Sequence, residues 1–101
     1  MELKSESIGG RVVFTVKGEV SATEARKFAD TLMESLPKET PWIEIDLSEC
    51  EYMCSNALGA LAATLMVARS RGGDVVVTAV SHNIKKLFDI TSLGSILRIR
   101  L

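Results

Sequence analysis

The chain has 101 residues, 47% of them hydrophobic, which is typical of one folded domain. These values exclude a two-domain enzyme and an intrinsically disordered chain. Twelve basic and thirteen acidic residues leave a net charge of −1, so no overall field attracts nucleic acid or an anionic membrane. We therefore expect a single domain over residues 1–101 that recognises partners by local surface, without nucleic acid binding or membrane insertion.

The charges are distributed unevenly along the chain. Residues 1–50 contain ten acidic and six basic residues, whereas residues 51–101 contain three acidic and six basic ones. No charged residue occurs between Glu51 and Arg69, but polar residues interrupt this segment, which favours a helix of a soluble protein over a membrane span. No basic and apolar leader opens the chain, and two cysteines fit a reducing compartment, so a cytoplasmic location is predicted.

The first elements are predicted to form a β-hairpin. Apolar and polar residues alternate over residues 11–17, which is typical of a half-buried strand. Gly9-Gly10 suits a hairpin turn and makes residues 2–8 an antiparallel partner. Gly18 is expected to end the second strand.

A helix is predicted after this hairpin. Ser21 and Glu24 have the spacing of a capping box, in which each side chain satisfies a free amide at the helix start. Pro37 is expected to stop the helix. Its apolar residues recur at helical spacing and are Ala25, Phe28, Ala29, Leu32 and Leu36.

The rest of the chain alternates between strands and helices. The elements expected there are a strand over 42–47, a helix over 55–71 stopped by Gly72-Gly73, a strand over 75–80, a short helix capped by Ser81 and a strand over 96–101. The full order is strand, strand, helix, strand, helix, strand, helix, strand. This order predicts an α/β domain with a mostly parallel five-stranded sheet and helices packed on it.

Residues that could form an enzyme or metal site are scarce. The single histidine, His82, is interpreted as structural, and Cys50 and Cys54 lack the further ligands of a zinc site. An acidic group, formed by Glu44, Asp46, Glu49 and Glu51, is interpreted as a solvated edge with Glu44 and Asp46 pointing outward. We therefore predict no enzymatic activity, no metal and no cofactor.

The uncharged helix over 55–71 is expected to have two apolar sides. Leu58, Leu61, Ala62 and Leu65 are predicted to face the sheet. The opposite side is formed by Ala57, Ala60, Ala63, Thr64 and Val67. Because a small two-layer domain leaves nothing to cover that side, we predict an exposed docking face for a partner protein. The alternative is burial by a second copy of the chain.

Ser55 is predicted to lie at the amino-terminal end of this helix. Free amides and the helix dipole there favour an anion, so a phosphate added to Ser55 would suit the position. The alternative, which the residues alone favour, is that the Ser55 hydroxyl simply caps the helix.

Several segments resemble the STAS domain of bacterial anti-sigma factor antagonists. They are Ile45-Asp-Leu-Ser48, Tyr52-Met-Cys-Ser-Asn-Ala-Leu-Gly59, Leu87-Phe-Asp-Ile-Thr-Ser-Leu-Gly94 and Gly18-Glu19-Val20. The resemblance covers nearly the whole chain and implies a regulatory partner switch. In this family the unphosphorylated antagonist docks on an anti-sigma factor that is also a serine kinase, and phosphorylation at the start of the second helix ends the docking.

The phosphorylation motif departs from the family pattern of Asp-Ser-Ser-Gly-Leu-Gly. The family's phosphoacceptor position falls on Asn56, and two of its aspartates fall on Cys54 and Ser21. We predict that the protein docks without being switched, with Asn56 as an unphosphorylated substitute; the alternative is that Ser55 is the acceptor. The predicted partner-binding residues are Ser21, Met53, Cys54, Ser55, Asn56, Ala57, Gly59, Ala60 and Ala63.

The resemblance leaves two other classes open. STAS domains also occur as accessory or scaffold subunits of transport and stress-signalling complexes, and a small-ligand sensor or enzyme is a third class, for which no residue constellation is found. Many relatives continue into a further helix, so the fold is expected to lack a long C-terminal helix. The exposed sheet flank then suggests a monomer or weak homodimer, although Arg98 and Arg100 would discourage strand pairing.

Overall fold

A β-hairpin begins the fold in the computed structural model, which describes residues 1–38 and 41–100. Strands β1 (Glu2–Ile8) and β2 (Arg11–Val20) pair antiparallel, as predicted. Gly9 and Gly10 have φ angles of 57° and 81°, a left-handed conformation that favours glycine at such a turn. The predicted end of the second strand is wrong, because β2 continues through Gly18, which has a φ of 82° at a register shift.

The remaining strands extend the sheet in parallel. They are β3 (Trp42–Met53), β4 (Asp74–Val80) and β5 (Arg98–Ile99). The strand order is β1-β2-β3-β4-β5, with only β1 antiparallel among these strands, so the predicted mostly parallel five-stranded sheet is confirmed. The expected end of β3 at residue 47 is wrong, because pairing with β2 carries the strand on to Met53.

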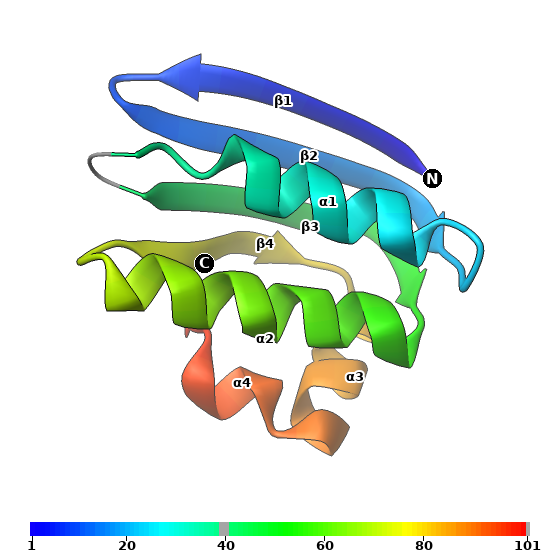
Figure 1. The fold of residues 1–101 in the computed structure, drawn as a ribbon. Coiled ribbons are helices and arrows are strands. Elements are labelled where there is room, and N and C mark those ends of the chain that lie inside the picture. Colours follow the sequence, from blue (N-terminus) through cyan, green and yellow to red (C-terminus); the bar gives the residue numbers. More distant parts are fainter. Residues whose placement is uncertain (39–40, 101) are drawn as a thin grey trace.

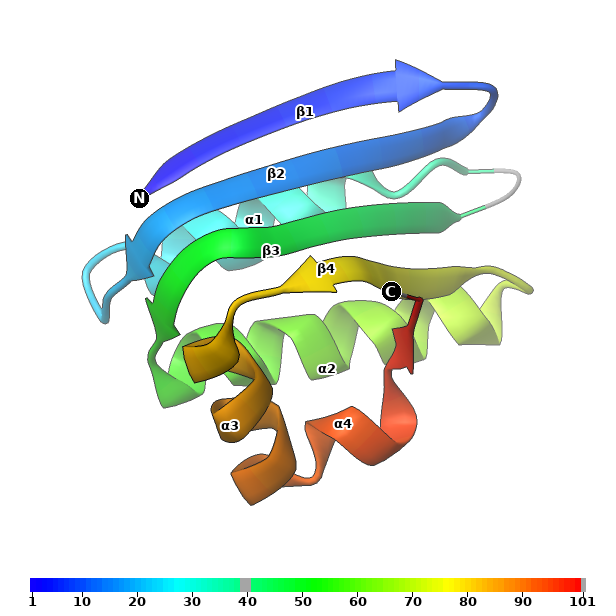
Figure 2. The ribbon, with the colours of Figure 1, turned by 180° about the vertical axis from the view of Figure 1, so that it is seen from behind.

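Two helices cover one face of this sheet. Helices α1 (Ala25–Ser35) and α2 (Ser55–Ser70) lie side by side in front of the strands in Figure 1. Among the described residues, no helix lies over most of the opposite face, which is seen in Figure 2, although α3 contacts β3. Helices α3 (His82–Thr91) and α4 (Leu93–Ile96) lie towards the β4 side of the sheet.

The hydrophobic core lies between the sheet and helices α1 and α2. The predicted alternation along β2 and β3 is confirmed, because the inward residues of both strands are almost fully buried. The largest fully buried side chains of these layers are Phe14, Phe28, Leu32, Ile43, Ile45, Leu47, Met53, Leu61 and Leu65. Their burial holds the sheet against both helices, which positions the carboxyl ends of β2 and β3 next to the helix starts.

The predicted capping box at Ser21 is not formed. Helix α1 begins at Ala25, and the Ser21 hydroxyl donates to Glu24 Oε1 over 3.0 Å instead of accepting from a helix amide. The reason is a turn over residues 22–24, which leaves Ser21 outside the helix and makes Glu24 the N-cap residue of α1. The Met1 amino group, 2.8 Å from Glu24 Oε2, and the Ser21 hydroxyl hold the pKa of the Glu24 carboxyl below its usual value.

The carboxyl-terminal part also differs from the prediction. The expected strand over 96–101 is wrong at its start, because α4 ends at Ile96 and β5 spans only Arg98–Ile99; Leu101 lies outside the described residues. The predicted cap of α3 is confirmed, since Ser81 Oγ accepts from the Ile84 amide over 3.2 Å. The predicted stop of α2 is also confirmed, with the Gly73 amide donating to the Ala68 carbonyl over 2.8 Å.

Candidate protein-docking site

The ends of β2 and β3 meet the starts of α1 and α2 at one edge of the sheet (Figure 1). Val20 and Met53 are register partners, and the Cys54 amide donates to the Val20 carbonyl over 3.0 Å. These contacts bring the turn that begins at Ser21 close to the turn that leads into α2. Two segments that are distant in the sequence are therefore neighbours in the fold.

Helix α2 begins without a side-chain cap. Its N-cap is Cys54, in an extended conformation with φ −70° and ψ 167°, and Ser55 is the first helical residue. In the part of the chain that the structure describes, the exposed Ser55 hydroxyl makes no hydrogen bond. The prediction that Ser55 caps the helix is wrong, and its hydroxyl lies in solvent beside the positive end of the helix dipole.

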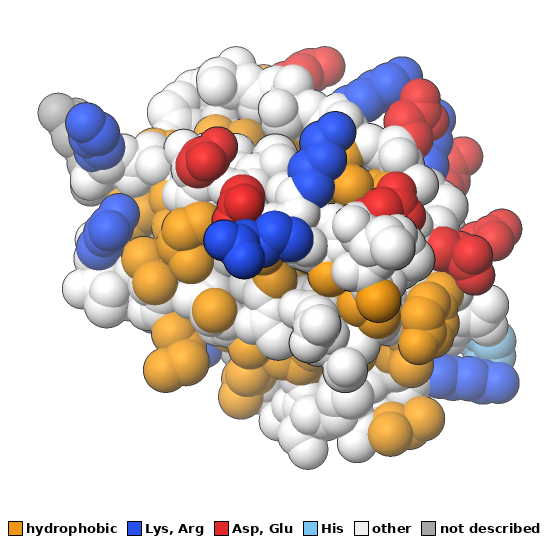
Figure 3. Space-filling model, turned by 45° about the vertical axis from the view of Figure 1, so that its right-hand side comes forward, with side chains coloured by type: hydrophobic (Ala, Val, Ile, Leu, Met, Phe, Trp, Pro, Cys, Tyr) orange, Lys and Arg blue, Asp and Glu red, His pale blue; other side chains and the backbone are white. Residues whose placement is uncertain are grey.

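A strip of exposed, uncharged residues runs along α2 from this point. We call it the α2 strip; its residues are Ser55, Asn56, Gly59, Ala63 and Met66. The Met66 side chain is 71% exposed, the second largest exposure among the large hydrophobic residues described. Figure 3 shows hydrophobic side chains gathered in the lower half of this side of the molecule, with most charged side chains around its upper and outer parts.

The predicted exposure of the outer side of α2 is partly wrong. Ala57 and Thr64 are only 0% and 1% exposed, and Ala60 and Val67 are half-buried, whereas Ala63 is exposed as predicted. The reason is that α1 packs beside α2, so the buried arc of α2 faces both the sheet and its neighbouring helix. The exposed surface is accordingly rotated towards Gly59, Ala63 and Met66.

Four of the nine predicted binding residues are placed unfavourably for direct contact. Met53 is 1% exposed and belongs to the core, so neither it nor Ala57 presents its side chain to a partner. Ser21 and Cys54 are half-buried, and the Ser21 hydroxyl already bonds to Glu24. Of the predicted set, the residues on the surface are Ser55, Asn56, Gly59 and Ala63, with Ala60 at the margin.

The structure also shows site residues that the sequence did not indicate. A groove with a volume of about 330 Å³ lies between the start of α1 and Asn56. Its α1 side is lined by Ala22, Ala25, Arg26 and Ala29. Arg26 is 89% exposed and pairs with Asp30 over 3.5 Å. The recurrence of alanine along one side of α1 was the only sequence pattern that indicated this groove. Nothing in the sequence placed Asn56 opposite these alanines.

Tyr52 belongs to a segment of the family resemblance but was not among the predicted binding residues. Its side chain is 46% exposed at the end of β3, three residues before Ser55 in the chain. Exposed tyrosine rings are favoured in protein interfaces because they combine apolar area with a polar hydroxyl. Tyr52 therefore extends the candidate site beyond the α2 strip.

The two cysteines have different environments. Cys50 is 0% exposed, and burial raises the pKa of its thiol to about 11. Its Sγ atom lies 3.6 Å from the Tyr52 carbonyl oxygen. Cys54 is half-buried at the N-cap of α2. Of the two thiols, Cys54 is the one accessible at the docking edge.

The acidic group on β3 does not form a solvated edge throughout. The Glu44 side chain is only 8% exposed, and its oxygens lie 3.1 Å from Arg11 Nε and 3.1 Å from Arg100 Nη2. The interpretation of Glu44 as solvated is therefore wrong, because arginines from two other parts of the chain cover it. Within residues 1–38 and 41–100, no group of three or more histidine, cysteine or acidic side chains is arranged to hold a metal ion.

No helix in the described ranges combines the length and the apolar composition required to cross a bilayer. His82, interpreted as structural, is an exposed residue at the start of α3.

Comparison with known proteins identifies relatives of this chain. The family described as "Mlab, STAS domain" matches residues 5–98. The anti-sigma-B factor antagonist of Listeria monocytogenes is 34% identical over 85 residues, which are 84% of this chain and 75% of that protein.

Solved structures share the same fold. A putative anti-sigma factor antagonist from Thermotoga maritima aligns with a TM-score of 0.88 at 21% identity, over 98% of this chain and 86% of that one. The unphosphorylated form of SpoIIAA, an anti-sigma factor antagonist of Bacillus, aligns with a TM-score of 0.83 at 14% identity, over 99% of this chain and 89% of that one. The chain thus belongs to the STAS domain family of bacterial anti-sigma factor antagonists.

Proposed function

We propose that this protein docks on an anti-sigma factor through the α2 strip and thereby releases a sigma factor from inhibition. The observation that carries the proposal is the exposed strip from Ser55 to Met66, which contains no charge. The name of the Listeria relative supplies the class of partner, because that protein is an anti-sigma-B factor antagonist. The partner is of the serine-kinase class that the family resemblance implies.

The shape of the strip suits a flat or helical partner surface. Ser55, Gly59 and Ala63 recur at one residue per turn and have small side chains, so a partner backbone can approach α2 closely. The strip from Ser55 to Met66 is about 17 Å long at a rise of about 1.5 Å per residue. Tyr52 at one end and Met66 at the other supply larger apolar contacts, and burying uncharged groups avoids the cost of desolvating ions.

The groove between α1 and α2 adds a recess beside the strip. Asn56 and Arg26 provide polar groups at its rim, where a partner side chain could be oriented by hydrogen bonds. In this arrangement the small residues of α2 allow the partner to approach closely, and the groove orients a partner side chain.

The switch is a separate proposal. In the first version Asn56 occupies the family's phosphoacceptor position, carries no hydroxyl and leaves docking unregulated by phosphorylation. In the second version Ser55 accepts the phosphate. The specific observation favouring Ser55 is that its hydroxyl is exposed and unused by the helix cap. A phosphate there would add about −1.5 to −2 charges at the end of an uncharged surface, which would oppose docking.

The docking proposal is tested by placing a charge on the strip. Ala63→Glu is expected to abolish binding to the purified anti-sigma factor in calorimetric titration, because a carboxylate would be buried without a partner. Ser70→Glu is the matched control, since Ser70 is exposed on the same helix beyond the strip. Thermal unfolding of both variants checks that the fold is intact. Full binding by a folded Ala63→Glu variant would contradict the proposal.

The switch is tested by measuring intact mass after incubation with the anti-sigma factor and ATP. A gain of one phosphate that Ser55→Ala abolishes supports the second version. An unchanged mass, together with a gain of one phosphate in Asn56→Ser, supports the first version. Phosphorylation that persists in Ser55→Ala would contradict both.

An accessory role in a transport or stress-signalling complex remains the alternative prediction. Affinity purification of the wild-type protein from its source cells distinguishes the two roles, using Ala63→Glu as the matched negative sample. Recovery of transporter subunits in place of an anti-sigma factor would replace the proposed function with the alternative.

A further inference from the structure

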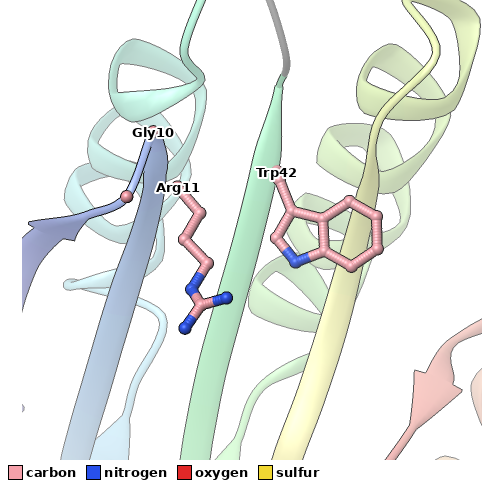
Figure 4. Close-up of a pocket in the computed structure, with 4 residues that line it drawn as sticks. Gly10, Arg11 and Trp42 are labelled. Carbon is pink, nitrogen blue, oxygen red and sulfur yellow. The ribbon is translucent and has the colours of Figure 1, made fainter.

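A second surface feature lies at the opposite end of the sheet from Ser55. It is a hollow with a volume of about 270 Å³, lined by Gly9, Gly10, Arg11 and Trp42 (Figure 4). These residues come from the β1–β2 turn and the amino-terminal ends of β2 and β3. The docking function uses none of them.

The strand register explains how Arg11 and Trp42 come together. Val12 pairs with Ile43 across the parallel strands, so Arg11 and Trp42 are neighbours one position earlier. Since Val12 and Ile43 point into the core, the preceding residues project from the face opposite α1 and α2. Figure 4 shows both side chains extending from this face, with the indole reaching towards β4.

The hollow is open on the glycine side. A Cβ atom added to Gly9 or Gly10 would meet no atom within 4 Å apart from those of the adjacent residues, so other elements leave the turn open. Trp42 is the only tryptophan of the chain and is half-buried, which leaves part of its ring at the surface. A flat ring is a favourable surface for stacking another ring.

Within the described residues, Arg11 has unused hydrogen-bond donors. The Arg11 Nε atom lies 3.1 Å from Glu44 Oε2. Within the described residues, this is the only ion pair of Arg11, and the Nη atoms of Arg11 form no side-chain hydrogen bond. Its side chain is 47% exposed. Glu44 is held independently by Arg100, so the Arg11 guanidinium can serve a ligand without leaving Glu44 unpaired.

The surrounding charges favour an anion. Arg11 and Arg100 pair with Glu44, while Arg69 and Arg98 pair with Asp74, which is the register partner of Trp42. Each of these two carboxylates is therefore paired with two arginines, a net formal charge of +1 in each of the two separate groups of ion pairs. Such a local excess attracts negatively charged groups over several ångströms.

We propose that this hollow binds a small planar anion, an aromatic ring carrying a carboxylate or phosphate group. The ring lies against the Trp42 indole, and the anionic group accepts hydrogen bonds from the Nη atoms of Arg11. Arginine is suited to this role because its fork of donors matches both carboxylate and phosphate. The volume of about 270 Å³ is just below the usual range of about 300 to 1,000 Å³ for ligand sites, which favours a compound of one or two rings.

The test is a titration of the isotope-labelled protein followed by nuclear magnetic resonance. The probes are adenosine monophosphate and 2-naphthoate, with adenosine and inorganic phosphate as the ring-only and anion-only controls. We expect the amide signals of Gly9 and Gly10 and the indole N–H signal of Trp42 to shift with the probes. Saturable binding of both probes would show that the hollow accepts aromatic anions of either kind. Saturable binding of only one probe would identify the ligand class as a nucleotide or an aromatic carboxylate.

Two variants assign the binding to its residues. Arg11→Gln and Trp42→Leu are each expected to weaken binding at least about tenfold. Lys17→Gln, which removes a paired cation on β2 outside the hollow, is expected to bind as the wild type does. Thermal unfolding checks each fold, and Arg11→Gln keeps the test decisive if Trp42→Leu unfolds.

The proposal would be overturned by any of three results. These are no saturable shift with either probe, equal binding by inorganic phosphate alone, and undiminished binding by folded Arg11→Gln. None of these results bears on docking through the α2 strip, so the two proposals fail independently.

Discussion

The backbone of Gly73 passes so close to Pro41 that an added Cβ atom would lie 1.9 Å from the Pro41 carbonyl oxygen. The same carbonyl accepts a hydrogen bond from the Asp74 amide over 3.1 Å, so it cannot simply move away. This contact joins the end of α2 to the chain entering β3.

We expect Gly73→Ala to lower the free energy of unfolding by about 2 kcal/mol or more, because backbone atoms must shift to relieve the overlap. Gly59→Ala is the matched control. A Cβ at Gly59, inside α2, meets nothing within 4 Å, so alanine should raise the free energy of unfolding by up to about 1 kcal/mol. Denaturant unfolding of both variants measures the difference, and equal effects would contradict the close contact.

The orientation of α2 in the structure predicts opposite outcomes for glutamate substitutions at two alanines of this helix. Ala57→Glu should unfold the domain or cost about 3 kcal/mol or more, because Ala57 is 0% exposed and the charge would be buried unpaired. Ala63→Glu should change stability by less than about 0.5 kcal/mol, as is usual for surface substitutions. Circular dichroism during thermal unfolding compares them. A stable Ala57→Glu variant would show that α2 is rotated as the sequence first suggested.

The two cysteines should differ in reactivity. Iodoacetamide is expected to alkylate Cys54 in the native protein and Cys50 only after unfolding, since Cys50 is fully buried and its thiol stays protonated at neutral pH. Intact mass should show one alkylation in buffer and two in guanidinium chloride. The Cys54→Ser variant should show none in buffer, and rapid native alkylation of that variant would contradict the burial of Cys50.

Cys50 also predicts a loss of stability at alkaline pH. Its pKa rises from an ordinary value of 9.0 to about 11 on folding, so the folded state keeps the proton more tightly than the unfolded state. The stabilisation is complete below pH 9.0 and is lost as the pH rises towards about 11. Unfolding curves of Cys50→Ala should therefore depend less on pH across this window. An identical pH dependence of stability in the wild type and in Cys50→Ala would contradict the prediction.

The ion pairs of Glu44 should stabilise the fold more than an exposed pair does. Arg100→Gln removes one of the two arginines that hold a carboxylate with a side-chain exposure of only 8%, and should cost about 1 to 2 kcal/mol. Arg26→Gln removes an exposed pair with Asp30 and should cost less than about 0.5 kcal/mol. Urea unfolding measures both. Equal costs would mean that the Glu44 pairs are no stronger than surface pairs.

Local patterns were sufficient for most elements. The alternation of Val12, Phe14 and Val16 predicted an inward strand face, and the glycine pair before Arg11 predicted the hairpin. Gly72 and Gly73 predicted the end of α2 because the left-handed turn after a helix requires glycine. Each of these signals acts within a few residues of the structure that it specifies.

Errors arose where distant segments decide the structure. The extension of β3 to Met53 depends on pairing with β2, and β5 starts late because α4 continues to Ile96. The burial of Glu44 depends on Arg11 and Arg100, which lie far from it in the sequence. Hydrophobic periodicity contains no information about these neighbours.

The sequence by itself determined a single α/β domain, its mostly parallel sheet and the uncharged segment around Ser55 and Asn56, because composition and local periodicity specify these properties. Only the tertiary structure decided which side of α2 is exposed. The reason is that α1 packs beside α2 and buries Ala57 and Thr64, leaving Gly59, Ala63 and Met66 at the surface. The same packing creates the groove beside Asn56, which no local pattern could reveal.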